Sequence, residues 1–237
     1  MHSAQRVDAL LFDVQGTATD FHSTVCRTAQ DLAEDRFPDY DWSDLVNRWR
    51  QAYFQETSQP RTAVDPWDSV VGIYRHTLDD LLDADGIGFS AVERDRLTDA
   101  WSRLEPWPDV LAGLRRLGTR FTLATLSNAD VSAVVGITRH GRLPWHATFA
   151  AEMAGVFKPD PAIYAMAARY LGTAPERIMM VASHKYDIRA AGALGFRTAF
   201  VARPLEFGAG NAADTDFSDE FDINATDFGD LADQLGC

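Results

Sequence analysis

The sequence predicts an α/β fold whose core is a Rossmann-like, doubly wound parallel sheet, with an inserted all-helical cap domain. Two observations support this prediction. From about residue 105 onward, short apolar runs of the kind that form buried parallel strands alternate with amphipathic helical stretches. Between the first apolar run and residue 105 the apolar spacing is helical throughout, which indicates an insertion after the first strand.

The first predicted strand is the apolar run Val7–Phe12, which stops at Asp13 and Gly16. The helical block that follows extends from about Thr24 to Arg103, and turn-forming segments with proline or glycine divide it into parts. Ser90 opens the last part, where the sequence Ser-Ala-Val-Glu has the pattern of a capping box. The predicted cap helices are residues 24–36, 43–57, 67–83 and 90–104.

Strands and helices then alternate to the end of the chain. The predicted strands are residues 121–126, 147–150, 178–182 and 198–201. The predicted helices are residues 109–117, 130–140, 161–171, 188–194 and 227–235. Residues 205–226 are rich in Gly, Asn and Asp, and we expect a loop with little regular structure there. We therefore assign residues 1–21 and 105–237 to the core and residues 22–104 to the cap.

The composition limits the classes of partner. The 237 residues carry 22 basic and 35 acidic side chains, a formal charge of −13. This acidity argues against nucleic-acid or anionic-membrane partners, because phosphate binding depends on clustered Lys and Arg. Two cysteines are too few for a disulfide framework. The N-terminal segment does not read as a signal peptide, and no stretch reaches the ~20 apolar residues that cross a bilayer, so we expect a cytoplasmic protein.

Polar residues follow four of the predicted strands: Asp13, Ser127-Asn128, Lys158 in a longer loop, and Ser183–Asp187. Each has a plain structural interpretation when taken alone, as a turn former, a helix cap or part of a solvated loop. Ligands of open parallel sheets bind beyond the carboxyl ends of the strands, where these residues would all lie. Their convergence predicts a shared site.

The four segments resemble the motifs of the haloacid dehalogenase superfamily, and the resemblance covers essentially the whole chain. The motifs are Phe12-Asp13-Val14-Gln15-Gly16-Thr17, Thr125-Leu126-Ser127-Asn128, Phe157-Lys158-Pro159-Asp160-Pro161 and Ser183-His184-Lys185-Tyr186-Asp187. Together they are highly specific, although none would be so alone. The resemblance implies that Asp13 is a covalent nucleophile.

Two positions bear on the kind of hydrolysis. Phosphatases of this superfamily normally carry a second Asp two residues after the nucleophile as general acid and base, and an extra carboxylate for Mg²⁺ in the fourth motif. This chain has Gln15 at the first position, and Ser183-His184-Lys185 before Asp187 at the second. A halide departs as a stable anion and needs no proton donor, so these residues favour metal-independent dehalogenation without a cofactor.

The chain more specifically resembles the L-2-haloacid dehalogenase (type II) branch, whose arginine segment is similar to Trp49-Arg50-Gln51. By this resemblance Arg50 binds the departing halide, a role that suits a permanent cation, and Arg48 is the alternative. Asn128 would assist the halide, and Ser127 would hold the substrate carboxylate. The residues implied at the site are Asp13, Thr17, Arg50, Lys158 and Asp187 for catalysis, and Val14, Gln15, Arg50, Ser127, Asn128, Tyr164 and His184 for substrate or halide binding.

The resemblance also implies roles around the nucleophile. Thr17 would orient the Asp13 carboxylate, and Lys158 would keep it ionised, since a nearby positive charge lowers the pKa of a carboxyl group. Asp187 would anchor Lys158 and help to place the hydrolytic water. Tyr164 would brace Lys158 or the substrate pocket.

Three departures from the branch leave alternatives open. Gln15 replaces an aromatic residue of the pocket wall, and Ala182 and His184 replace Ser and Asn before the final Asp. His184 orients water, serves as the base, or is a hydrogen-bonded structural residue, and either His184 or Asp187 activates the water. Aromatic residues of the cap would line the pocket, or, for most of them, pack inside the cap. They are Trp42, Trp49, Tyr53, Phe54, Trp67 and Tyr74.

We therefore expect hydrolysis of short (S)-2-haloalkanoic acids to (R)-2-hydroxy acids, with haloacetates, including fluoroacetate, as further substrates. The alternative on the same fold is a phosphatase or phosphonatase that acts on a small phosphorylated metabolite. A non-catalytic binding module is the third interpretation, and intact Asp13, Lys158 and Asp187 argue against it. The expected partner is the small haloacid, and the resemblance suggests a homodimer.

Overall fold

A parallel sheet of five strands forms the centre of the core in the computed structural model, which describes residues 7–59 and 66–237. The strand order is β4-β1-β5-β6-β7, and every neighbouring pair is parallel. The strands are β1 (Ala9–Phe12), β4 (Thr122–Thr125), β5 (Ile178–Ala182), β6 (Arg197–Val201) and β7 (Ile223–Ala225). The predicted doubly wound α/β fold is confirmed.

Strand β1 lies between β4 and β5, where the winding of the sheet reverses. Its residues are almost wholly buried, as expected for a strand covered on both faces. The register pairs Phe12 with Thr125 on one side and with Val181 on the other, so the three strands end at nearly the same level. This edge is the position where ligands of open α/β sheets bind, and Asp13 follows β1 there.

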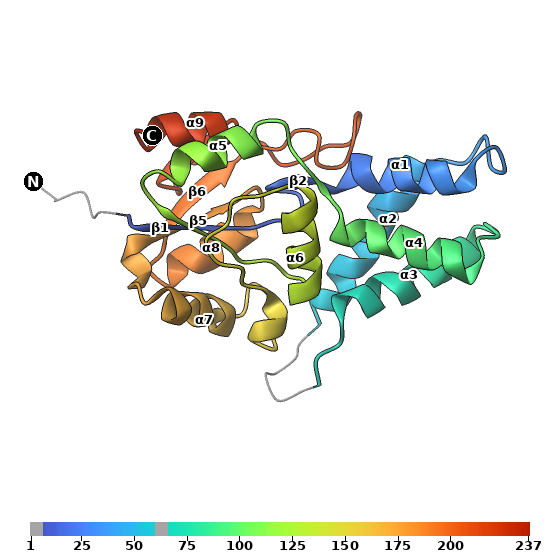
Figure 1. Ribbon diagram of the computed structural model, residues 1–237, viewed down its shortest axis with the longest axis horizontal. Coiled ribbons are helices and arrows are strands. Elements are labelled where there is room, and N and C mark those ends of the chain that lie inside the picture. The colour runs from blue at the N-terminus through green and yellow to red at the C-terminus, as the bar shows by residue number, and fades with distance from the viewer. Residues whose placement is uncertain (1–6, 60–65) are drawn as a thin grey trace, which may run out of the picture.

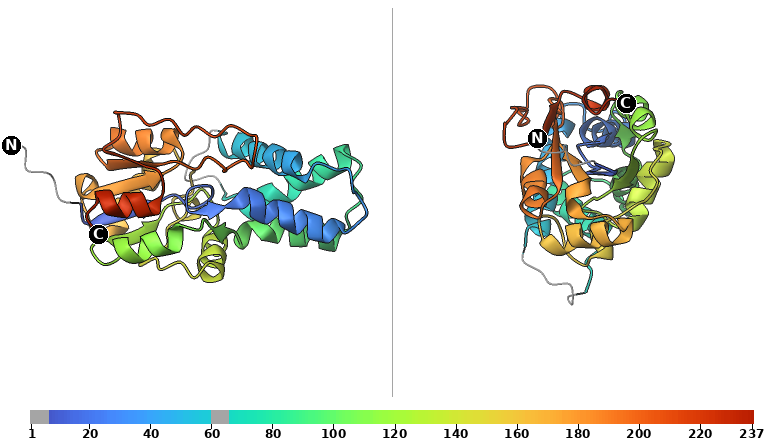
Figure 2. Two further views of the ribbon diagram at one scale, coloured as in Figure 1. Left: turned by 90° about the horizontal axis from the view of Figure 1, so that it is seen from above. Right: turned by 90° about the vertical axis from the view of Figure 1, so that its left-hand side faces the viewer.

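Helices cover both faces of the sheet (Figure 1, Figure 2). On one face α5 packs against α9, where Gly113 is required because an added Cβ would overlap Phe228. On the other face α8 contacts β5 and β6, and α7 packs beside it. The core helices are α5 (Val110–Leu117), α6 (Val131–His140), α7 (Pro161–Leu171), α8 (Lys185–Ala193) and α9 (Phe228–Gln234).

The inserted helices lie together at one end of the molecule (Figure 1). They are α1 (Phe21–Ala33), α2 (Trp42–Thr57), α3 (Val70–Ala84) and α4 (Ala91–Asp99), followed by a short 3₁₀ turn, η1 (Ala100–Ser102). Each α-helix begins at an Asp or Ser whose side chain accepts a backbone N–H of the first turn. The capping box predicted at Ser90 is present, with Glu93 as its second member.

Paired strands and a helix cap are among the contacts that join the cap to the core. The chain enters the cap through β2 (Thr19–Asp20) and leaves through β3 (Glu105–Pro106), and these short strands pair antiparallel. The Asp130 carboxylate at the start of α6 accepts hydrogen bonds from the backbone N–H groups of Val70 and Val71 at 3.1 and 2.8 Å. A core carboxylate therefore caps the first turn of cap helix α3.

Some predictions about local structure differ from what is observed. Residues 147–150 form only two isolated bridges instead of a strand, because the Thr125 hydroxyl takes the Phe149 N–H and C=O that a ladder would use. The segment 205–226 has little regular structure, as predicted, and its one regular element among the described residues is the edge strand β7 (Ile223–Ala225). Helix α8 begins at Lys185, three residues before the predicted start at Ile188, and α1 begins at Phe21, three residues before the predicted start at Thr24.

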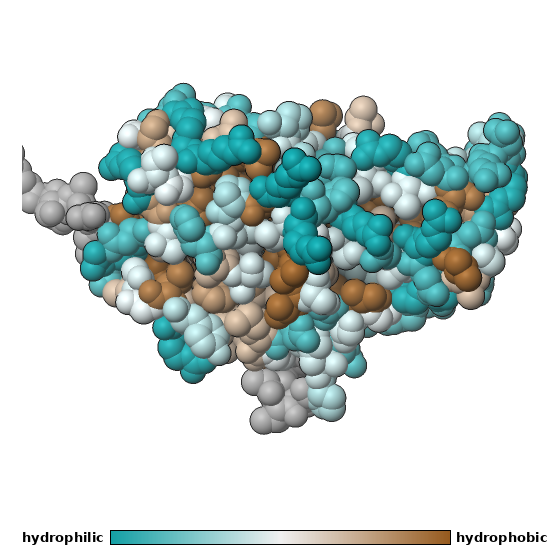
Figure 3. Space-filling model, viewed as in Figure 1, coloured by the Kyte–Doolittle hydropathy of each residue, from teal (hydrophilic) through white to brown (hydrophobic). Residues whose placement is uncertain are grey.

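The surface fits the acidic, polar composition. Hydrophilic residues cover most of the face drawn in Figure 3, and apolar residues appear there in separate patches. Within the described ranges, no helix has the length and apolar character that a membrane crossing requires.

Candidate active site

A small cavity lies at the carboxyl edge of the sheet, between the core and cap helix α2. Its volume is about 10 Å³, close to the space that one water molecule needs. It is lined by Asp13, Gln15, Arg50, Tyr53, Phe54, Ser127, Asn128, Lys158, His184 and Tyr186. The cavity therefore brings together residues of all four predicted motifs and of the cap.

Asp13 is the centre of this arrangement, and both oxygens of its buried carboxylate accept hydrogen bonds. Thr17 Oγ1 donates to Oδ2 at 2.7 Å, and Lys158 Nζ donates to Oδ1 at 2.8 Å. Nδ1 of His184 lies 3.1 Å from Oδ2. Thr17 is itself fixed, because its hydroxyl accepts the backbone N–H of Ser183 at 2.9 Å.

The charge on Asp13 is held by its neighbours. Burial raises the pKa of this carboxyl group, but the positive charge of Lys158 and the hydrogen bond from His184 outweigh burial and hold the pKa well below its usual range. Burial likewise lowers the pKa of the Lys158 ammonium, and the Asp13 and Asp187 carboxylates more than reverse this effect and raise it. Both groups are therefore charged at neutral pH.

Asp187 fixes the position of Lys158, and Tyr164 in turn fixes Asp187. Nζ of Lys158 lies 2.5 Å from Asp187 Oδ2, and the Tyr164 hydroxyl donates to Oδ1 of the same carboxylate at 2.6 Å. Burial and the nearby Asp13 charge raise the pKa of Asp187, although Lys158 opposes them. Neither Asp187 nor Tyr164 lines the cavity, so both act on it through Lys158.

Arg50 reaches the cavity from α2 and contacts Gln15 beside the nucleophile. Its Nη1 donates to Gln15 Oε1 at 2.9 Å and to the Tyr74 hydroxyl at 2.8 Å. The guanidinium also stacks over the rings of Phe21 and Tyr53, at 5.0 and 4.7 Å from their centroids. The Arg50 side chain is therefore held in a fixed orientation at the cavity.

The Gln15 amide has a defined orientation for the same reason. Because Arg50 only donates hydrogen bonds, the amide oxygen must face it. Gln15 is only 3% exposed, yet its Nε2 has no hydrogen-bond partner among the described residues. A buried N–H donor is thus available beside Arg50 and Asp13.

The competing arginine, Arg48, lies elsewhere. It binds Asp44 at 2.7 Å and Asp85 at 2.5 Å on the outer side of α2. Positions 48 and 50 differ by about 200° around a helix, so only one can face the core. The geometry selects Arg50.

The second motif contributes one lining side chain and one brace. Ser127 is buried and lines the cavity. The Asn128 amide lines it too, but it bonds mainly to the backbone of Lys158: Oδ1 accepts the N–H at 2.7 Å and Nδ2 donates to the C=O at 3.1 Å. Asn128 therefore fixes the loop that carries Lys158.

His184 lies between two carboxylates. Its Nε2 is 2.7 Å from Glu206 Oε1, on the side opposite to Asp13. Burial lowers the pKa of this imidazole, but the Glu206 and Asp13 carboxylates outweigh burial and raise the pKa to about 10. His184 is therefore an imidazolium at neutral pH while Asp13 is ionised.

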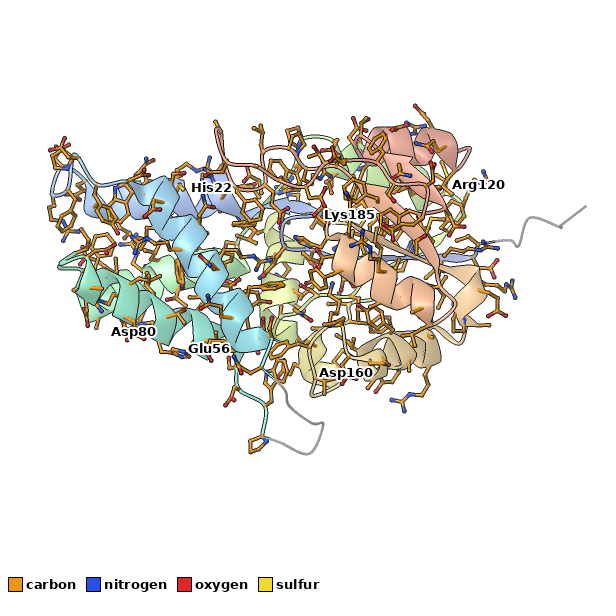
Figure 4. All side chains as sticks on the ribbon, turned by 180° about the vertical axis from the view of Figure 1, so that it is seen from behind. His22, Glu56, Asp80, Arg120, Asp160 and Lys185 are labelled. Atoms are coloured by element: carbon orange, nitrogen blue, oxygen red, sulfur yellow. The ribbon has the colours of Figure 1, made fainter. Side chains whose placement is uncertain are left out.

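Some residues differ from the sequence-based expectation. Val14 is fully buried and is not part of the cavity wall. Lys185 does not point to Asp13, since its ammonium contacts Asp214 at 2.6 Å on the surface; Figure 4 labels it on α8. Most cap aromatics pack inside the cap, as expected, and only Tyr53 and Phe54 among those named line the cavity.

Sequence reasoning missed Glu206 and Tyr186 as site residues. Tyr186 lies inside the fourth motif, at the first turn of α8, so its place next to His184 was a usable signal. Glu206 lies in the loop after β6 and belongs to no motif. Only its burial, 4% exposed, distinguishes it from other acidic residues of that loop.

A further finding concerns metal ligands. In residues 7–59 and 66–237, no group of three or more His, Cys, Asp or Glu side chains is arranged to hold a metal ion. The Asp13 and Asp187 carboxylates are both bound by the Lys158 ammonium.

Comparison with known proteins gives the family. A sequence profile described as haloacid dehalogenase-like hydrolase matches residues 7–195. The chain belongs to this family. One of its relatives is (S)-2-haloacid dehalogenase 1 of Pseudomonas sp. (strain CBS-3), which is 30% identical over 83% of this chain and 85% of that protein.

Two crystal structures of this haloacid dehalogenase-like family are similar over nearly the whole chain. The L-2-haloacid dehalogenase PA0810 is 38% identical, with a TM-score of 0.89 over 97% of this chain and 100% of that one. The defluorinating L-2-haloacid dehalogenase Rha0230 is 31% identical, with a TM-score of 0.90 over 99% and 98%. The resemblance to the L-2-haloacid dehalogenase branch is confirmed.

Proposed function

We propose that this chain hydrolyses short (S)-2-haloalkanoic acids to (R)-2-hydroxy acids through an ester on Asp13. One observation carries the proposal. The ionised Asp13 carboxylate lies against Lys158, while position 15 beside it holds an amide bound to Arg50 instead of a proton donor. Such a site suits a leaving group that departs as an anion, and the (S)-2-haloacid dehalogenases among its relatives support the assignment.

In the first step, an oxygen of Asp13 attacks C2 of the substrate in line with the carbon–halogen bond. The carbon–oxygen bond of the ester forms as the halide leaves with the electron pair, which inverts the configuration at C2. Thr17 and Lys158 hold the carboxylate in position for this attack. Asp187 and Tyr164 keep Lys158 in place from the buried side.

Arg50 and Gln15 form the site for the departing halide. The Arg50 guanidinium supplies a permanent positive charge, and the free Gln15 Nε2 supplies an N–H donor that nothing else in the described chain uses. Asn128 Nδ2 has a second N–H beyond the one given to Lys158. Ser127 is the proposed donor to the substrate carboxylate on the cavity wall.

Residues 22–104 act as a cap over a core of residues 1–21 and 105–237 in this proposal. A cavity of about 10 Å³ holds little more than a water molecule, so cap and core must separate for a haloacid to enter. Closing them again excludes bulk water and strengthens the electrostatic interactions around Asp13.

The test is halide release from chloroacetate, (S)-2-chloropropionate and fluoroacetate, each with and without EDTA. We expect halide and an (R)-2-hydroxy acid from (S)-2-chloropropionate, no reaction of the (R) enantiomer, and no effect of EDTA. Release of fluoride from fluoroacetate would show that the halide site stabilises a departing fluoride well enough for the carbon–fluorine bond to break. Magnesium-dependent hydrolysis of an aryl phosphate without any halide release would instead establish the phosphatase or phosphonatase alternative.

Two further proposals come from the resemblance to the type II branch. They are a homodimer and a cytoplasmic location. Sedimentation of the purified protein tests the first, and fractionation of the producing cells tests the second.

A further inference from the structure

The side of Asp13 opposite to Lys158 contains a pair of side chains that the displacement of halide does not use. His184 Nδ1 faces Asp13 Oδ2 at 3.1 Å, and His184 Nε2 faces Glu206 Oε1 at 2.7 Å. Glu206 is 4% exposed, so its carboxylate is nearly removed from solvent. A buried charge of this kind is costly unless it is paired, and His184 is the partner that it contacts.

The turn that carries Glu206 is fitted closely to both the site and the cap. Gly16 has φ +92°, and an added Cβ there would overlap the Glu206 carboxylate and come within 3.3 Å of the His184 ring. Two residues after Glu206, Gly208 has φ +84°, and its Cβ would overlap the ring of His22. Figure 4 labels His22 on the first cap helix.

The start of the same turn is fixed by Arg203. Its Nε donates to the Thr17 C=O at 2.8 Å, and its two Nη atoms bind both oxygens of Asp109 at 2.8 and 2.9 Å. The Glu206 N–H then bonds to the Arg203 C=O at 3.1 Å. Glu206 is therefore held on a rigid support next to His184 and is not a surface acid that happens to reach it.

We propose that Glu206 is a positioning residue that holds His184 as the base for hydrolysis of the Asp13 ester. This inference rests on the proposed function. A Glu206 carboxylate can only accept at Nε2, so it keeps the proton on Nε2 and leaves Nδ1, the nitrogen that faces Asp13, free to accept one.

Formation of the ester would itself switch His184 into this role. While Asp13 is a carboxylate, its charge favours a proton on Nδ1, and the imidazolium has a partner on each side. Alkylation removes that charge but leaves the Glu206 charge, so the proton on Nδ1 loses the partner that held it. His184 can then release this proton to solvent and bind the hydrolytic water through Nδ1. It takes a proton from solvent again once Asp13 is a carboxylate.

Hydrolysis of the ester consumes one water molecule and returns Asp13 to its carboxylate. His184 Nδ1 takes one proton from water while the water oxygen bonds to Cγ of Asp13. The tetrahedral intermediate breaks the bond between Cγ and the substrate-linked oxygen, and this alkoxide takes the proton from Nδ1 and leaves as the 2-hydroxy acid. The Asp13 carboxylic acid that remains loses the second proton of the water to solvent.

The other candidate base, Asp187, is poorly placed. Its side chain is wholly buried, its two oxygens are bound by Lys158 and the Tyr164 hydroxyl, and it does not line the cavity. Water bound to His184 Nδ1 would instead lie next to Asp13. The geometry therefore separates the roles that the sequence left open between His184 and Asp187.

Rapid-quench mixing with excess (S)-2-chloropropionate tests the inference, since it separates halide release from ester hydrolysis. For Glu206→Gln we expect a burst of one chloride per site at the wild-type rate. Steady turnover should then fall by about a hundredfold, within the range for loss of general-base catalysis. Mass spectrometry of the quenched protein should show the ester on the peptide that contains Asp13.

Two controls complete the experiment. Glu220→Gln makes the same change at an exposed residue of the same loop that pairs with Arg189, and it should behave like the wild type. His184→Asn should also accumulate the ester, and adding Glu206→Gln to it should slow hydrolysis no further, because Glu206 acts through His184. Urea unfolding of each variant, which does not depend on chloride release, reports how many sites are folded.

The outcomes are distinct. A Glu206→Gln variant that turns over like the wild type, or one that loses burst and turnover equally with all sites folded, would overturn the inference but not the proposed function. An additive loss in the double variant would also overturn it. Wild-type protein that releases no chloride would overturn both.

Discussion

The Lys158 ammonium and the Asp187 carboxylate form a fully buried ion pair, with Nζ 2.5 Å from Oδ2 and neither side chain more than 1% exposed. Lys158 also binds Asp13, so one cation compensates two buried carboxylates. The ammonium donates its third hydrogen bond to the Leu126 C=O at 2.9 Å. All of its donors are satisfied, which allows a charged lysine to remain in the interior.

Removal of this cation should damage both stability and activity. In Lys158→Met the two carboxylates lose their partner, and we expect a loss of about 3–5 kcal/mol in the free energy of unfolding. Halide release should fall at least about a hundredfold, because the charged nucleophile is no longer stabilised. Lys185→Met, at a partly exposed ion pair on the surface, should cost about 1 kcal/mol or less. Urea unfolding of both variants measures this difference, and equal losses would contradict it.

Two arginines on one helix provide a matched test of the halide site. Arg50→Lys keeps a positive charge but loses the planar donors that bind Gln15 and Tyr74, so the chloride burst should slow by about tenfold or more. Arg48→Lys, whose side chain binds Asp44 and Asp85, should leave the burst rate unchanged. Rapid-quench measurement of the released chloride gives both rates. A larger effect of Arg48→Lys would mean that the halide binds on the side of α2 that carries Arg48, which would contradict the proposed halide site.

The connection between core and cap can be tested at Asp130. Its carboxylate accepts two backbone N–H groups of α3 and also the Trp67 indole at 2.7 Å and the Ser69 hydroxyl at 2.9 Å. Asp130→Ala should therefore cost about 2–4 kcal/mol, more than a single helix cap. Asp160→Ala, which removes one such cap hydrogen bond at α7, should cost about 1 kcal/mol. Thermal unfolding should rank the two in this order, and the reverse order would show that the cap is held elsewhere.

Stability should also depend on pH through His184, which faces Asp13, Glu206 and the Tyr186 ring. The folded-state pKa of His184 is about 10, against an ordinary value of 6.5. Because it is raised, the stabilisation is fully present below about pH 6.5 and is lost as the pH rises toward 10. The difference in Tm between wild type and His184→Asn should shrink from pH 6 to pH 10, roughly the range between these two values. A difference that is constant over this range would mean that His184 is neutral in the folded protein.

The sequence was sufficient to predict the site residues that follow the strands. It was insufficient to predict the residues that reach the site from segments outside the motifs. Asp13, Lys158 and Asp187 were predictable because parallel strands must end at one edge, and the structure joins them as expected. Arg50 and Arg48 remained open, since helical spacing does not show which face of α2 meets the core. Only the structure separates the two arginines, because it shows that Arg50 contacts Gln15.

Glu206 shows why the remainder was not predictable. It lies in a segment without apolar periodicity. Its approach to His184 depends on the absence of a side chain at Gly16, which is far away in the sequence. The paired strands β2 and β3 were missed for a related reason. Each has two residues, too few for any alternating pattern.

The central claim is that Asp13 itself displaces the halide and that water then attacks its carboxyl carbon. A single turnover in H₂¹⁸O, with enzyme in excess over (S)-2-chloropropionate, tests it most directly. We predict that ¹⁸O appears in the peptide that contains Asp13 and that the 2-hydroxy acid remains unlabelled. Label in the 2-hydroxy acid after this first turnover, with Asp13 unlabelled, would show that water displaces the halide directly and would contradict the claim.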